Sequence, residues 1–354
     1  MKKLIVYLLL ICLCLPLTGC GKSLSSERDI RVVFIPKITG NSFFDAANDG
    51  AQEHAEKNGY TVDYRGSDTA RIEVQIEIVE EAIAEKVDAI VISALDPIAL
   101  DGYLKKAMDA GIKVITWGSD VSSDARMLMV SQGTPEQLGT MLVEMGAKSL
   151  TERGMNPATD PIKYVWHYSR EGVVDQNSWH DMGEAYIAAT YPNWVNVHPE
   201  NYYSHQFPNL AVGTGKMIFN NHPDIDLIIC NDSTALPSQA EVARGLGLDA
   251  QTITITGFAT PNAMREYCED GTVARWGFWD CKIQGALACY LAYYLAQGNE
   301  LEVGDKISVP EIGIVQIMPN SVLGESTVQT PNSGVVLLTA RSEFTIKNVN
   351  DYDF

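Results

Sequence analysis

The feature that most constrains the fold is a regular alternation between short apolar runs and longer amphipathic segments. The run at 89–93 is apolar almost throughout, which is typical of a strand buried on both faces of a parallel sheet. An amphipathic helix is predicted over 98–110, and another apolar strand follows over 112–117. Strand–helix–strand units of this kind predict a parallel sheet with helices on both faces.

The alternation runs along the chain in two successive series. The first series has predicted strands at 31–36, 60–64, 89–93 and 112–117, with helices at 43–57, 70–85 and 98–110. The second has strands at 164–168, 226–230, 252–256 and 273–279, with helices at 135–150, 177–190, 233–244 and 283–296. The 354-residue chain also exceeds the size at which single cores stop growing. The predicted fold class is therefore α/β, with two doubly wound parallel-sheet lobes joined by a hinge. Lobe 1 is predicted at 30–133 and 281–314, and lobe 2 at 134–280 and 315–354.

The N-terminus has the pattern of an export signal. Lys2 and Lys3 precede an apolar run, Leu4 to Leu15, which at about twelve residues is too short to span a bilayer. The run ends in Leu17-Thr18-Gly19-Cys20, which resembles the lipobox of bacterial lipoproteins. We therefore predict a signal peptide over 1–19, lipidation at Cys20 and a lipid-anchored linker over 20–29. The alternative is an ordinary cleaved signal with an unmodified Cys20, and both place the remaining chain outside the cytoplasm.

Charge and cysteine spacing exclude several classes of partner. The formal net charge of −19 argues against binding to nucleic acid or to anionic lipid headgroups. The cysteines beyond Cys20 are Cys230, Cys268, Cys281 and Cys289, and none has the spacing of a zinc site. We predict no metal and no cofactor. The four cysteines are interpreted mostly as small buried hydrophobic residues, with disulfide pairing as the alternative.

Polar and aromatic residues gather where the predicted strands end. In doubly wound sheets, ligands bind beyond the carboxyl ends of the strands. The candidate ligand-binding residues are Lys37, Phe43, Phe44, Gly118, Asp120, Asp175, Gln176, Asn231, Ser233 and Trp279. Carboxylates accept hydrogen bonds from hydroxyls, lysine and amide groups donate them, and aromatic rings cover the apolar face of a sugar ring. This composition predicts a site for a small polyol.

Each candidate also has a purely structural interpretation. A loop lysine such as Lys37 is by itself more often a solvated surface residue, and Asp175 or Ser233 could cap the helix that follows. The aromatic candidates could belong to the core or to the packing between lobes. Their common placement at strand ends is what favours a binding site.

The chain resembles the type I periplasmic sugar-binding proteins from about residue 30 to residue 354. Within that family it is most similar to the members that bind autoinducer-2. The likeness is dense in Phe34-Ile35-Pro36-Lys37, Ser131 to Gly139, Asp175 to Trp179, Gly257 to Met264, Val315 to Val322 and Tyr352-Asp353-Phe354. The resemblance implies an extracytoplasmic substrate-binding lipoprotein of an ABC importer, monomeric and anchored to the cell membrane by lipid. Such a protein closes on its ligand and then docks on an ABC permease.

The resemblance also implies which residues bind the ligand. The family's ligand lysine falls on Lys37, and its Asp-Gln pair falls on Asp175 and Gln176. The family pattern Trp-Asp-Ser-Asp reads Trp-Gly-Ser-Asp over 117–120, so one ligand carboxylate is missing at Gly118. At 231–234, Asn-Asp-Ser-Thr replaces the family's Pro-Asp-Ala-Asn, whose Pro and Ala contacts come from the backbone. Autoinducer-2 is the expected ligand, with rhamnose or a pentose as the alternative.

Two other classes of function are weighed against ligand import. An enzyme is not predicted, because the sequence has no metal motif, nucleophile elbow or phosphate-binding glycine loop. A sensor that hands its signal to a receptor kinase or chemoreceptor has the same fold, and the sequence does not separate it from a transport protein.

Overall fold

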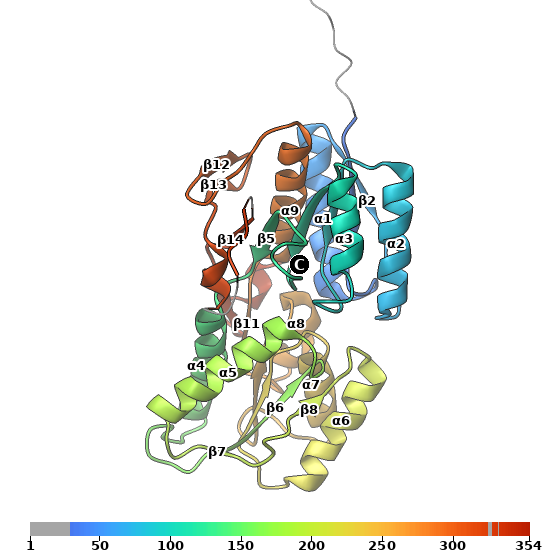
Figure 1. Ribbon diagram of the computed structural model, residues 1–354. Coiled ribbons are helices and arrows are strands. Elements are labelled where there is room, and N and C mark those ends of the chain that lie inside the picture. Colours follow the sequence, from blue (N-terminus) through green and yellow to red (C-terminus); the bar gives the residue numbers. More distant parts are fainter. Residues whose placement is uncertain (1–28, 325–327, 332) are drawn as a thin grey trace, which may run out of the picture.

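The computed structural model describes residues 29–324, 328–331 and 333–354, which form two lobes (Figure 1). The predicted signal peptide, Cys20 and all but the last residue of the predicted linker lie outside the described residues. One lobe contains α1–α3 and α9, and the other contains α4–α8 (Figure 1). Within the described part of the chain, no helix combines the length and apolarity needed to cross a bilayer.

The first lobe is built on a parallel sheet in the order β2-β1-β3-β4-β5-β14. Its strands are β1 (Arg31–Ile35), β2 (Thr61–Tyr64), β3 (Ala89–Ile92), β4 (Lys113–Trp117), β5 (Leu128–Ser131) and β14 (Gly334–Leu337). The helices are α1 (Ser42–Asn58), α2 (Ile72–Glu85), α3 (Asp101–Asp109) and α9 (Cys281–Ala296).

Alternation of side chains along each strand divides the first lobe into two cores, because successive residues point to opposite faces of a sheet. Val33 and Ile90 pack in the core that contains residues of α2 and α3. Val32 and Val91 pack in the core that contains residues of α1 and α9. Burial of both faces explains why the strand at 89–92 is apolar throughout.

The second lobe has the parallel order β10-β9-β6-β7, with β8 also paired to β6. The strands are β6 (Lys163–Tyr168), β7 (Val195–Asn196), β8 (Tyr202–Tyr203), β9 (Leu227–Cys230) and β10 (Thr254–Gly257). The helices are α4 (Pro135–Glu152), α5 (Val174–Thr190), α6 (Pro208–Asn221), α7 (Ala235–Gly245) and α8 (Pro261–Glu269). The predicted α/β class with two parallel sheets is confirmed, whereas β5, β7, β8, α6 and α8 were not predicted.

Local signals in the sequence set several helix ends near the cleft. The Asn41 side chain accepts a hydrogen bond from Phe43 N at the start of α1, which ends at Gly59 with a φ of 75°. At α4, Thr134 is the N-cap and forms a reciprocal capping box with Gln137, and Pro135 occupies the first helical position. Both helices begin beside the cleft between the lobes, so their caps also position the loops that line it.

The chain passes between the lobes after β5, after β11 (Trp276–Phe278) and after β14. β11 pairs antiparallel with β15 (Ser342–Phe344), and the hairpin β12–β13 (Lys306–Val309 and Gly313–Gln316) lies between α9 and β14. Two short 3-10 helices, η1 (Asn320–Leu323) and η2 (Val349–Asp351), complete the C-terminal part. Because β14 pairs with β5, the prediction that all of 315–354 belongs to lobe 2 was wrong. The apolar run at 334–337 returns the chain to the first sheet before it ends in the second lobe.

The cysteine interpretation is confirmed in the described residues. Cys230, Cys268, Cys281 and Cys289 are all buried and free. Burial raises the pKa of the Cys230 and Cys289 thiols, which keeps them protonated and unreactive.

Candidate ligand-binding site

A cavity lies between the lobes, at the facing carboxyl ends of the two sheets. The predicted site residues that line it are Lys37, Phe43, Phe44, Gly118, Asp175, Gln176, Asn231, Ser233 and Trp279. Asp120 is the one candidate that does not line it. Since both sheets are parallel and meet at the same end, residues from distant parts of the chain converge here.

Lys37 follows β1 and is almost fully buried, with 6% of its surface exposed. Burial lowers the pKa of its ammonium group, while the charges of Asp175 and Asp232 act to raise it. Among the described residues, the ammonium makes no hydrogen bond or ion pair within contact distance. A desolvated lysine in this position can donate to the oxygens of a bound ligand.

Asp175 lies in the first turn of α5 and joins the two lobes. Its Oδ1 accepts a hydrogen bond from Ser119 Oγ, at 2.8 Å, and Ser119 follows β4 of the first lobe. The cap residue of α5 is Val173, with no side-chain hydrogen bond, so Asp175 does not cap the helix. Asp175 is therefore a cavity carboxylate, in contact with the opposite lobe.

Hydrogen bonds of neighbouring residues fix the Gln176 side chain and show that Ser233 does not cap a helix. Gln176 Oε1 accepts from Ser169 N at 3.1 Å and from Ser169 Oγ at 2.8 Å, which fixes the orientation of its amide. Ser233 is not the cap of α7, because Asp232 Oδ2 accepts from Ala235 N at 3.0 Å instead. Burial raises the pKa of the Asp232 carboxyl group, and hydrogen bonds from Ser204 and the backbone oppose that shift.

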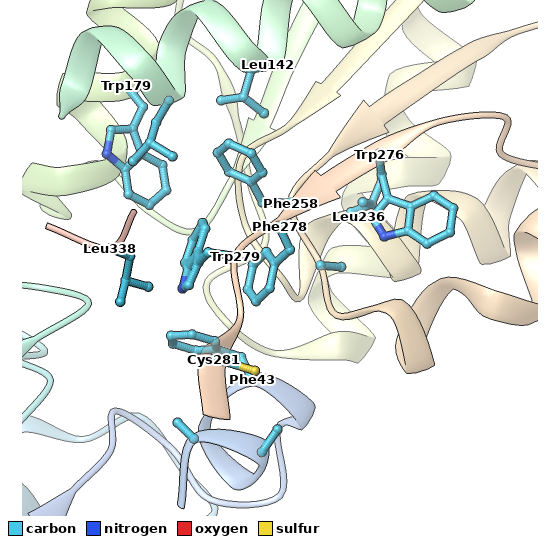
Figure 2. Close-up of a cluster of buried hydrophobic side chains, with 14 of the residues drawn as sticks. Phe43, Leu142, Trp179, Leu236, Phe258, Trp276, Phe278, Trp279, Cys281 and Leu338 are labelled. Atoms are coloured by element: carbon cyan, nitrogen blue, oxygen red, sulfur yellow. The ribbon is translucent and has the colours of Figure 1, made fainter. Parts of the chain in front are cut away.

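Several aromatic side chains line the cavity, and they pack against one another in the cluster that Figure 2 shows. Trp279 stacks on Phe278 with ring centroids 4.1 Å apart, and Phe43 from the first lobe meets it edge-on at 5.9 Å. Trp179 lies 6.1 Å from Trp279 on the side of the second lobe. The Trp279 Nε1 donates to Gln284 Oε1 at 2.7 Å, which holds the indole in place. The rings thus pack the lobes together and also present an apolar surface to a ligand.

Gly118 lies at the position where the family resemblance implies a ligand carboxylate. Its φ of 70° is in the left-handed region that glycine favours. A Cβ at this position would lie 3.2 Å from Ser93 Oγ and 3.8 Å from the ring of Phe43, both of which line the cavity. A side chain at this position would therefore contact cavity-lining residues, and its Cβ would pack tightly against Ser93.

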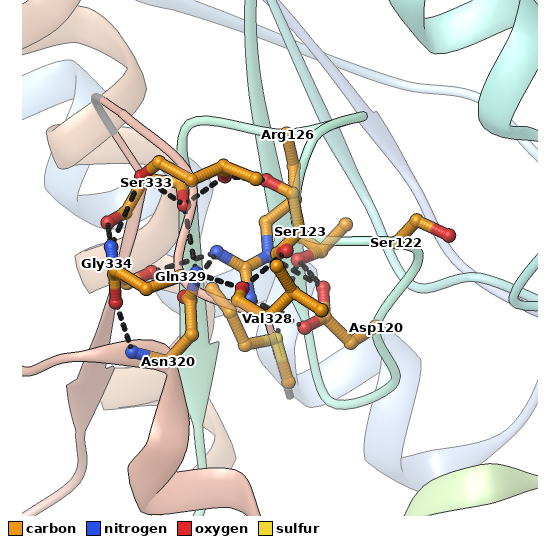
Figure 3. Close-up of polar contacts among 12 residues, drawn as sticks. Asp120, Ser122, Ser123, Arg126, Asn320, Val328, Gln329, Ser333 and Gly334 are labelled. Carbon is orange, nitrogen blue, oxygen red and sulfur yellow. Dashed lines mark hydrogen bonds and ion pairs between the residues drawn. The ribbon is translucent and has the colours of Figure 1, made fainter. Parts of the chain in front are cut away.

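Asp120 forms an ion pair with Arg126 (Figure 3). The Arg126 Nε donates to Oδ1 and its Nη2 to Oδ2, both at 2.8 Å. The Arg126 side chain is fully buried and also donates to Asn320 Oδ1 and Gly334 O, both at 3.0 Å. Asp120 lines an adjoining cavity that shares Gly118 and Asp175 with the first one. Its carboxylate oxygens are both paired with Arg126, because a buried guanidinium requires a carboxylate partner.

Several cavity residues were not among the sequence candidates: Ser93, Ser119, Gln132, Trp179, Gln206, Asp232, Phe258 and Phe278. Most lie beside predicted strand ends, where the same rule would have found them. Among the described residues, three buried side-chain oxygens at the cavity lack a hydrogen-bond partner: Ser93 Oγ, Gln206 Oε1 and Asn231 Oδ1. Buried polar atoms are usually paired, so their convergence on one cavity indicates a polar ligand. No group of described residues has the composition of a metal site.

Two doubly wound lobes that face each other across a polar cavity define a protein that encloses a small solute. The family model of the periplasmic binding protein domain matches residues 32–300, and the chain belongs to that family. The chain is also 54% identical to LsrB from Clostridium saccharobutylicum, whose structure is a complex with AI-2. That likeness covers 92% of this chain and 100% of LsrB, with a TM-score of 0.90.

Two other relatives are less similar to this chain than LsrB is. The D-ribose/D-allose-binding protein of Pseudomonas aeruginosa is 27% identical over 260 residues, which is 69% of this chain and 75% of the relative. An ABC transporter solute-binding protein from Clostridium phytofermentas, solved with bound L-rhamnose, is 21% identical with a TM-score of 0.80. That likeness covers 92% of this chain and 98% of that protein, and it shows a shared fold. The predicted fold class and the predicted class of substrate-binding protein are confirmed.

Proposed function

We propose that this protein is the extracytoplasmic substrate-binding lipoprotein of an ABC importer, and that it binds autoinducer-2 (AI-2) between its lobes. The observation that carries the proposal is the convergence of Lys37, Asp175 and Gln176 on one cavity. The 54% identity to LsrB, solved with AI-2, supports the same ligand.

The two lobes would hold the ligand from opposite sides. Lys37 comes from the first lobe and donates to ligand oxygens, whereas Asp175, Gln176, Asn231 and Ser233 come from the second. The closed form is favoured because only a bound ligand satisfies both sets of polar groups at once. The closed form then docks on a membrane permease.

Gly118 supports a second candidate ligand. Without a carboxylate there, an AI-2 hydroxyl needs another acceptor, and the absence of any side chain at Gly118 suits a ligand with one more substituent. Rhamnose or a pentose is therefore the alternative, in keeping with the sugars bound by the more distant relatives.

Membrane anchoring and the transport partner belong to the same proposal. The lipobox at 17–20 supports lipidation of Cys20, and family membership supports an ABC permease as the partner of a monomer. A sensor that signals to a receptor kinase or chemoreceptor is the alternative role. Adjacent genes for a permease and an ATPase would favour transport, and an adjacent kinase gene would favour sensing.

The deciding experiment identifies the ligand that the protein carries. Mass spectrometry of small molecules released from denatured protein should detect AI-2, and calorimetry should show tight binding of AI-2 and weak binding of D-ribose and L-rhamnose. Tight binding of a sugar with no binding of AI-2 would overturn the ligand but keep the binding-protein class. Chemical change of the ligand during incubation would instead indicate an enzyme.

A further inference from the structure

Gln206 is a buried polar residue at the cavity that neither the sequence candidates nor the family resemblance assigns. It follows β8 in the second lobe, and 6% of its surface is exposed. Its Oε1 is buried without a hydrogen-bond partner among the described residues, and the side chain lines the cavity. A buried amide without a partner destabilises a protein, so its presence here requires an explanation.

The backbone at Gln206 is strained as well. His205 has a φ of 53° and Gln206 a φ of 62°, so two consecutive residues other than glycine occupy the left-handed region. Such residues persist only where the surrounding structure holds them, and they gather at sites that bind ligands. The strain and the unpartnered amide thus occur at the same residue.

Hydrogen bonds from the second sheet hold this turn in place. Ser204 N donates to Tyr168 O and His205 N to Ser169 O, both at 2.7 Å, at the carboxyl end of β6. Ser204 Oγ donates to Asp232 Oδ2 at 2.6 Å and accepts from Gln206 N at 3.1 Å. The turn at 204–206 is therefore fixed to the end of the sheet, next to the cavity.

We propose that Gln206 is a specificity-determining ligand contact, whose side-chain amide hydrogen-bonds one hydroxyl of the bound polyol. The inference rests on the proposed function, because it needs a hydroxyl-bearing ligand between the lobes. A ligand with a hydroxyl at this place satisfies the buried amide, whereas a deoxy analogue leaves it unpaired. Sites built in this way reject analogues that lack the group.

The test replaces the amide with an apolar group of similar length. In Gln206→Met, the affinity for AI-2 should fall about threefold to tenfold by calorimetry, as expected for loss of one neutral hydrogen bond. The unfolding temperature of the ligand-free protein should stay the same or rise, because an unpartnered polar group is removed. His205→Met is the matched control, since His205 shares the left-handed backbone but is exposed, and it should leave the affinity unchanged.

The outcomes separate this inference from the proposed function. An unchanged affinity for AI-2 in Gln206→Met, or an equal loss in His205→Met, overturns the role of Gln206. If Gln206→Met does not fold, Gln206→Gly relieves the left-handed strain and should show the same loss of affinity. If the wild type binds D-ribose or L-rhamnose but not AI-2, only the proposed ligand fails, and the same variants are compared with that sugar. A wild type that binds none of the three probes overturns both.

Discussion

At the scale of single residues, Lys37 and Asp175 come from different lobes, and both line the cavity. Lys37 is desolvated, which lowers its pKa, and the charge of Asp175 opposes that shift. The Oδ1 atom of Asp175 accepts a hydrogen bond from Ser119 Oγ in the opposite lobe. Because Lys37 is buried and Asp175 is partly buried, their hydrogen bonds to a ligand should be stronger than they would be in water.

Replacement of Asp175 by asparagine should weaken ligand binding strongly. Asp175→Asn keeps the shape but exchanges an acceptor oxygen for a donor amide. Hydrogen bonds to charged groups contribute about 1.5–3 kcal/mol, so the affinity for AI-2 should fall about tenfold to a hundredfold by calorimetry. Asp181→Asn is the control, since Asp181 is on the same helix but its side chain is 76% exposed. Equal affinity of wild type and Asp175→Asn would place Asp175 outside the site.

Restoration of the carboxylate at Gly118 should distinguish the two candidate ligands. Aspartate tolerates the left-handed backbone better than most residues, and its Cβ would require a small shift of Ser93. If AI-2 is the ligand, Gly118→Asp should bind it more tightly than the wild type and Gly118→Ala do. Weaker binding in both variants, measured by titration with AI-2, ribose and rhamnose, would mean that the true ligand occupies this space.

At the scale of elements, the segment that follows β4 connects three parts of the molecule. The Gly118 carbonyl accepts from Gln132 Nε2 at 3.1 Å, and Ser119 bonds across the cavity to Asp175. Asp120 forms an ion pair with Arg126, and Arg126 donates hydrogen bonds to Asn320 and to the carbonyl of Gly334 at the start of β14. One short segment therefore links the ligand cavity, the opposite lobe and a chain segment that leads from one lobe to the other.

Loss of the Ser119 hydroxyl should shift the ligand-free protein toward an open form. Ser119 donates to a carboxylate, and a hydrogen bond to a charged group contributes about 1.5–3 kcal/mol, so Ser119→Ala should lower the affinity for AI-2 about tenfold to a hundredfold. Small-angle scattering should show a larger radius of gyration without ligand. Ser122→Ala, in the same loop but away from the cavity, serves as the control. Tighter binding in Ser119→Ala would mean that Ser119 competes with the ligand for Asp175.

At the scale of the whole molecule, two separate sheets share one cavity and are joined by segments after β5, β11 and β14. One continuous hydrophobic core contains residues of both lobes. The aromatic rings of Phe43, Trp279 and Trp179 pack where the lobes meet (Figure 2). Such an arrangement favours hinge motion, because each sheet stays intact while the connecting segments change conformation.

Membrane attachment should be separable from ligand binding. Cys20→Ala should abolish lipid incorporation, detected by intact mass, and move the protein from the detergent phase to the aqueous phase. The affinity for AI-2 should not change, because Cys20 precedes β1 in the chain and all the cavity residues come after it. A wild-type protein without lipid, with unchanged partitioning of the variant, would refute the anchor.

The sequence alone was sufficient to predict the two parallel sheets and the edge at which the cavity lies. The apolar run at 89–92 and the helices beside it follow local rules of periodicity and capping. Lys37, Asp175 and Gln176 could be placed at the cavity because the carboxyl ends of parallel strands share one edge. These features depend on neighbours in the chain or on a general property of the fold.

Only the tertiary structure decided which polar residues face the cavity. Asp120 pairs with Arg126 because a buried charge needs an opposite charge, and nothing in the local sequence shows that Arg126 is buried. Gln206 reaches the cavity through a left-handed turn after a two-residue strand, too short for periodicity to reveal. β14 joins the first sheet although it is distant from β5 in the chain. Periodicity reports how a segment relates to its neighbours, whereas the partners of buried polar groups and edge strands are set by packing between distant segments.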